Sequence, residues 1–208
     1  MKPFEVHRGI CAPILVDNVD TDQIIPSREM TRVSKLGLGK GLFAGWRYVF
    51  DGTEKVGTNP DFVLNQPRYD GASILYGGRN FGCGSSREHA VWALRDFGIK
   101  AILAESFGRI FRSNCVRNGL LAIILPAPTI EELRKQTDSD PQTRRITIDL
   151  TSRELRTPDG DTIEFKIEDA VRNMLLKGLD PIDYSLQFQA DIRRFVDRDR
   201  TQRPWAHL

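Results

Sequence analysis

The segment at residues 77–89, GGRNFGCGSSREH, holds the densest group of side chains that could do chemistry. Its four glycines allow the backbone to approach a ligand closely. The helix expected to begin near Arg87 offers unpaired N–H groups and a partial positive charge. The guanidinium of Arg87 is a bidentate donor for the same ligand. The segment therefore predicts a binding site for a carboxylate or a phosphate.

A structural role would explain part of this segment. Ser85 and Glu88 have the spacing of a capping box, in which each side chain satisfies the other's backbone N–H. Capping does not explain the glycines, Ser86, or a cation at Arg87, where the helix dipole disfavours positive charge. From the residues alone, an anion site and a capped turn both stay open.

Two catalytic or cofactor interpretations are weaker. Gly82-x-Gly84-x-x-Arg87 resembles a dinucleotide fingerprint with Glu105 about twenty residues on, but arginine replaces the small third glycine. Cys83 could be a nucleophile paired with a histidine two residues after Arg87, but the helix should carry that histidine away from the loop.

Composition excludes several classes of protein. The 208 residues include 30 Lys and Arg against 28 Asp and Glu, interspersed, so no basic field exists for a nucleic-acid backbone. No apolar run approaches the length of a membrane span, and we expect a cytoplasmic protein. The three cysteines, Cys11, Cys83 and Cys115, lack a CxxC pair, so we expect no metal site in this chain.

The elements that must position the glycine-rich segment have an α/β pattern. Apolar strands are expected at 72–76, 99–104 and 120–125, separated by helices at 87–97 and 106–119. This βαβαβ order predicts a parallel core. Antiparallel strands should follow around the turn at residues 158–161, and an opening strand at 6–16 leads into the acidic turn 17–22, which includes Asp22.

We expect one domain over residues 1–190 and a charged, solvated or partner-bound tail at 191–208. Between about residues 27 and 66, glycines interrupt both the helical and the strand-like spacing of apolar residues, which predicts a long lid-like loop. Its aromatic side chains, expected to be exposed, are Phe43, Trp46 and Tyr48.

Several motifs resemble one known family. NFGCGSSREHA at 80–90 is similar to the signature of the swivelling β/β/α domain of the aconitase superfamily, and ESFGRI at 105–110 resembles the helix start that follows it. NVDTDQIIP at 18–26 matches the family's other motif. LFAGWR at 42–47 and NPDFVLN at 59–65 resemble the small subunits of bacterial isopropylmalate dehydratases in particular. The resemblance covers nearly the whole chain except the tail.

This resemblance implies a hydro-lyase that interconverts 2- and 3-isopropylmalate by dehydration and rehydration in leucine biosynthesis. It implies that Ser85 is the general base and that Ser86 and Arg87 bind a substrate carboxylate or stabilise the base. The backbone of Gly84 and the side chain of Asp22 would lie in the same site. Where aconitases often have an acidic residue between the two glycines, this chain has a cysteine.

The resemblance also implies a partner. A [4Fe-4S] cluster would accept the leaving hydroxide as a Lewis acid, and it would belong to a large subunit in a heterodimer or heterotetramer. The loop at 27–66 is the candidate to meet the substrate's apolar branch. Two alternatives stay open: a related hydro-lyase acting on citraconate or dimethylmalate, and a non-catalytic anion-binding partner module.

Overall fold

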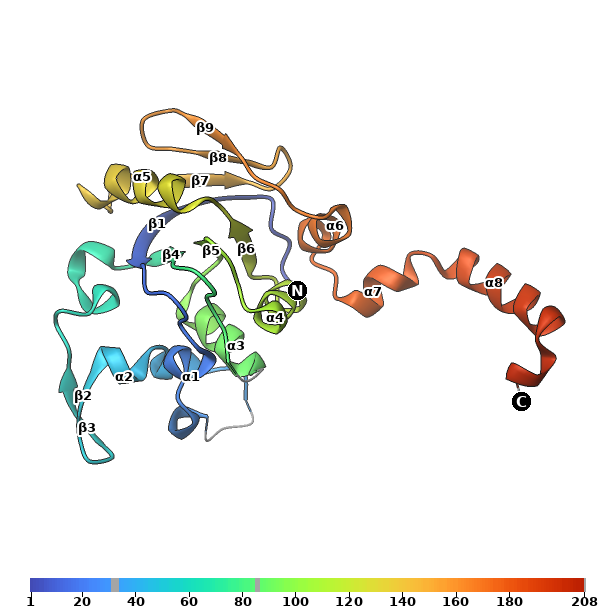
Figure 1. The fold of residues 1–208 in the computed structure, drawn as a ribbon, viewed down its shortest axis with the longest axis horizontal. Coiled ribbons are helices and arrows are strands. Elements are labelled where there is room, and N and C mark those ends of the chain that lie inside the picture. The colour runs from blue at the N-terminus through green and yellow to red at the C-terminus, as the bar shows by residue number, and fades with distance from the viewer. Residues whose placement is uncertain (31–33, 85–86, 208) are drawn as a thin grey trace.

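The computed structural model describes residues 1–30, 34–84 and 87–207. One seven-stranded sheet with the order β6-β5-β4-β1-β7-β8-β9 organises the chain (Figure 1). Four strands form its parallel half: β1 (Val6–Ile14), β4 (Ala72–Gly77), β5 (Ala101–Ala104) and β6 (Leu121–Ile124). Three form its antiparallel half: β7 (Ile146–Asp149), β8 (Glu154–Arg156) and β9 (Thr162–Glu164).

Strand β1 joins the two halves. It pairs in parallel with β4, where Cys11 is in register with Ile74, and antiparallel with β7, where His7 is in register with Ile148. The predicted α/β class, with a parallel βαβαβ core and added antiparallel strands, is confirmed.

Both faces of the parallel half are covered. On one face lie α1 (Thr21–Ile24), α3 (Glu88–Phe97) and α4 (Arg109–Arg117), and on the other lie α5 (Ala127–Asp138) and α6 (Asp169–Lys177). In β5, Ile102 packs toward the first face and Leu103 toward the second. A strand buried on both sides reads as a continuous apolar run, which is why the sequence indicates it so clearly.

The predicted lid-like loop at 27–66 is wrong as a structureless segment. It contains short helices and a two-stranded sheet: η1 (Ser27–Glu29), η2 (Leu38–Gly41), α2 (Ala44–Arg47), β2 (Tyr48–Asp51), β3 (Glu54–Thr58) and η3 (Val63–Asn65), followed by η4 (Pro67–Tyr69). The aromatics are also not exposed as expected. Phe43 is fully buried and stacks on Trp46 at 5.5 Å between ring centroids, while Trp46 and Tyr48 are half-buried.

Close packing against α3 explains why this segment contains glycines that interrupt its helical and strand-like patterns. A Cβ on Gly39 would lie 2.7 Å from the backbone nitrogen of Phe97, so only glycine fits there. The carboxylate of Asp96 accepts hydrogen bonds from the backbone nitrogens of Gly37 and Gly39 at 2.9 and 2.8 Å. These glycines anchor the segment to α3.

The C-terminal part leaves the body as an extended helical arm (Figure 1). It consists of α7 (Pro181–Leu186), α8 (Gln189–Gln202) and η5 (Pro204–Ala206), so the segment expected as a charged tail is helical where described. The buried carboxylate of Asp199 accepts hydrogen bonds from Arg203 at 2.7 Å and pairs with His207 at 2.7 Å, which folds the end of the chain back onto α8. Across the described residues, no helix has the length and apolar character needed to cross a membrane.

Candidate active site

Three segments that are distant in sequence meet beyond the carboxyl ends of β1, β4 and β5. The backbone nitrogen of Gly82 donates to Val19 O at 2.7 Å, and the nitrogen of Thr21 donates to Cys83 O at 3.0 Å. The nitrogen of Gly108 donates to Phe81 O at 2.9 Å. Because carboxyl ends of neighbouring parallel strands lie at one edge of a sheet, the loops that follow them form a shared surface.

Two glycines make this meeting possible. A Cβ on Gly82, whose φ is +73°, would lie 2.2 Å from the ring of Phe111, and a Cβ on Gly108 would lie 2.3 Å from Gly82 O. Close packing between segments therefore accounts for part of the glycine content that the sequence attributes to ligand approach. Gly84, at φ +85°, lies against Asp20.

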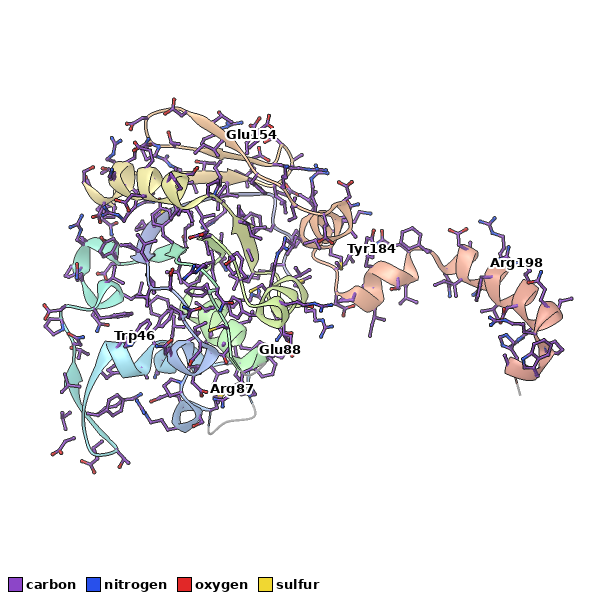
Figure 2. The ribbon with its side chains drawn as sticks, viewed as in Figure 1. Trp46, Arg87, Glu88, Glu154, Tyr184 and Arg198 are labelled. Carbon is purple, nitrogen blue, oxygen red and sulfur yellow. The ribbon has the colours of Figure 1, made fainter. Side chains whose placement is uncertain are left out.

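Asp22 and Arg87, two residues predicted to share a site, are brought together. Their side chains form an ion pair, 50% and 28% exposed respectively, although 65 residues separate them in sequence. A capping box between Asp20 and Gln23 fixes the turn that carries Asp22: Gln23 N donates to Asp20 Oδ1 at 2.7 Å, and Asp20 N donates to Gln23 Oε1 at 2.8 Å. Figure 2 shows Arg87 beside this turn.

The capping-box interpretation, left open by the sequence, is not supported at Glu88. Arg87 itself is the N-cap, in extended backbone and without a side-chain cap, and Glu88 is the first helical residue. The carboxylate of Glu88 instead accepts a hydrogen bond from Asn118 Nδ2 at 2.7 Å, and Asn118 Oδ1 accepts one from Trp92 Nε1 at 3.0 Å. Ser85 and Ser86, the predicted base and carboxylate ligand, lie outside the described residues.

A hollow of about 630 Å³ opens beside the glycine-rich segment. Residues 82–84 line it together with one side of α4 from Arg109 to Arg117. Its charged lining within the described chain consists of Arg87, Arg109 and Arg117, with no Asp or Glu. Such a surface suits a small anion.

Arg109 and Arg117 are site candidates that the sequence analysis missed. With Ser113 they stand at intervals of four residues, which places them on one side of a helix. That spacing was the available signal. The predicted positions of the strands did not indicate that this side of α4 faces the hollow.

The cysteine-nucleophile interpretation is not supported. Cys83 is half-buried and its thiol donates to Asn18 O at 3.3 Å, whereas the ring of His89 packs on Trp92 with 4.6 Å between centroids. The dinucleotide interpretation also lacks its geometry. Gly82 lies five residues beyond the end of β4, in a loop that pairs with two other segments before α3 begins.

The remaining two thiols are buried on opposite faces of the sheet: Cys11 lies in β1 on the side covered by α5, and Cys115 lies in α4 on the other side. Burial raises the pKa of Cys11 to about 12 and also raises the pKa of Cys115. Within the described ranges, no group of three or more His, Cys, Asp or Glu residues could hold a metal ion. The thiols of this chain therefore do not fit an iron-sulfur cluster.

Comparisons with known proteins agree on one family. The model of the aconitase C-terminal domain matches residues 1–128. The 3-isopropylmalate dehydratase small subunit of Cupriavidus necator is 55% identical over 208 residues, covering 100% of this chain and 99% of the relative. The subunit of the same name from Rhodopseudomonas palustris (strain HaA2) is 45% identical over 206 residues, covering 99% and 100%. A crystal structure of 3-isopropylmalate dehydratase from Methanocaldococcus jannaschii superposes with a TM-score of 0.63 at 27% identity, covering 91% of this chain and 98% of that one.

Proposed function

Because the chain belongs to the aconitase C-terminal domain family, we propose that it is the small subunit of a 3-isopropylmalate dehydratase, a lyase that works with a large subunit. The likeness to small subunits of that name extends over the full length of the chain. The observation that carries the proposal is the pairing of Asp22 with Arg87. These residues come from the two family motifs, and Arg87 lines a hollow of about 630 Å³ that has no Asp or Glu among its described lining residues.

The reaction removes a proton from the carbon next to a carboxylate while hydroxide leaves the neighbouring carbon. Water then adds back with the two positions exchanged. As the C–H bond breaks, negative charge develops on the adjacent carboxylate. A guanidinium held in place stabilises that charge more in the transition state than in the ground state. The ion pair with Asp22, which orients Arg87, supports the proposal that Arg87 has this role.

The proton acceptor proposed from the sequence is Ser85, with Ser86 as a further carboxylate ligand. A serine hydroxyl must be ionised to act as a base, which requires stabilisation by backbone N–H groups and a nearby cation. Gly84 and Arg87 flank the two serines in sequence and line the hollow. They are the groups proposed to stabilise the alkoxide.

The second catalytic group must come from elsewhere. We propose that the large subunit contributes a [4Fe-4S] cluster, which acts as a Lewis acid toward the leaving hydroxide when bound. The active enzyme is then a heterodimer or heterotetramer in the cytoplasm, with its site between the chains.

Reconstitution tests this proposal. The purified chain mixed with a cluster-loaded large subunit should interconvert 2- and 3-isopropylmalate, and neither chain should do so alone. Citraconate and dimethylmalate serve as competing substrates, and a higher kcat/KM for either would reassign the substrate. Activity of the isolated chain, or stoichiometric iron and sulfide bound to it, would contradict the division of labour.

A further inference from the structure

The proposed substrate needs more positive charge than the Asp22–Arg87 pair supplies. A dicarboxylate brings two negative charges. Arg87 is the cation of the glycine-rich segment that lines the hollow, but its charge is already offset by the paired carboxylate of Asp22. The pair is neutral overall, so it can orient one carboxylate but balances neither of the substrate's negative charges.

Two more cations line the same hollow, Arg109 and Arg117. Within the described part of the chain, neither has an ion pair or a side-chain hydrogen bond, whereas most other arginines of the body have one or both. Side chains without internal partners beside a hollow without carboxylates give it a net positive field.

Arg109 is held next to the glycine-rich segment. It is the first residue of α4, and the residue before it, Gly108, contacts Gly82 O so closely that no Cβ fits between them. Gly108 also donates its N–H to Phe81 O at 2.9 Å. The start of α4 is thus anchored to the loop that carries Arg87. Arg117 stands eight residues further, roughly 12 Å along the helix axis.

We propose that Arg109 binds the second carboxylate of the substrate and thereby selects dicarboxylates over monocarboxylates. The inference rests on the proposed function, which supplies the dicarboxylate. Arg87 takes the carboxylate next to the reacting carbon, and Arg109, at the start of α4, takes the other. Arg117, too far along α4 to contact the same group, attracts the anion.

Arg112 provides a matched control on the same helix. It lies one turn after Arg109, and both residues line the neighbouring groove with Val171 and Met174, but only Arg109 also lines the hollow beside the glycine-rich segment. Arg112→Gln removes the same charge from the same helix. It therefore shares any general effect of charge or helix stability with Arg109→Gln.

The experiment compares Arg109→Gln and Arg112→Gln, each assembled with the large subunit. Arg109→Gln should raise KM for isopropylmalate roughly tenfold to a hundredfold, the range for losing a charge-assisted hydrogen bond, and change kcat much less. Calorimetric binding of succinate to the complex should weaken by a similar factor. Binding of the monocarboxylate 4-methylpentanoate should stay unchanged. Arg112→Gln should leave all of these values near wild type.

Equal weakening of succinate and 4-methylpentanoate in Arg109→Gln would overturn the inference, as would equal effects of the two variants. A wild-type complex without isopropylmalate turnover would instead contradict the proposed function. The two failures are distinguishable, because the succinate comparison measures discrimination between anions without any turnover.

Discussion

Replacing Arg87 by lysine separates the catalytic and structural roles of the Asp22–Arg87 pair. Lysine keeps the positive charge but loses the planar fork that binds a carboxylate through two N–H groups. The two side chains are 28% and 50% exposed, so the pair lies in the class of ion pairs that contributes at most about 1 kcal/mol to stability. For a chain of this size, that loss lowers Tm by only about 2–4 °C.

The expected loss of activity is much larger. If Arg87 holds a substrate carboxylate, Arg87→Lys removes a charge-assisted hydrogen bond of about 1.5–3 kcal/mol, which lowers kcat/KM by roughly 10- to 150-fold. This loss is measured by assaying the isomerisation of isopropylmalate by the assembled complex. The formation of the unsaturated intermediate is the signal that is monitored. Thermal unfolding of the variant chain measures stability separately.

Arg144→Lys is the matched control. Arg144 pairs with Asp159, and those side chains are 32% and 49% exposed, close to the values for the Asp22–Arg87 pair. Arg144 lies far from the glycine-rich segment, beside the hairpin turn between β8 and β9, and lines no part of the hollow. Because Arg144 also donates to Gln136 O, its replacement should cost at least as much stability as Arg87→Lys and leave kcat/KM unchanged. Equal activity losses in both variants, or full activity in Arg87→Lys, would refute the assignment of Arg87.

Three further outcomes follow from contacts of the described residues. Glu88→Ala removes one of the two acceptors of the buried Asn118 amide, whose other hydrogen bond is to Asn114 O, and should cost about 1–3 kcal/mol of unfolding free energy. Glu88→Gln should cost less, and both variants should retain most turnover; denaturant titration and assay of the complex check this. Gly39→Ala should destabilise the chain by about 1–3 kcal/mol because its Cβ would collide with the backbone of Phe97, and an unchanged melting temperature would argue against that packing. Iodoacetamide should label Cys83 in the folded chain and reach the two buried thiols only in denaturant, as mass spectrometry of the labelled peptides would report.

Local pattern was enough to predict much of the fold. The apolar run of β5 predicts a strand buried on both faces, and the alternation of strands and helices predicts the parallel core. Gly98, in left-handed backbone at φ +117°, ends α3 as expected. These features depend on neighbours within a few residues, so the sequence by itself determines them. The motif residues Asp22 and Arg87 also came from the sequence, through the family resemblance.

The tertiary structure decided what depends on distant partners. Ser85 and Glu88 have capping-box spacing, yet Glu88 bonds Asn118, which lies 30 residues away. Glycines that locally resemble a flexible loop are instead packed against α3, because a backbone contact at Gly39 leaves no room for a side chain. The place of Arg109 in the hollow depends on the docking of α4 against the glycine-rich loop. Periodicity and spacing report a residue's near neighbours along the chain, whereas capping, burial and charge balance are set by residues that only folding brings into contact.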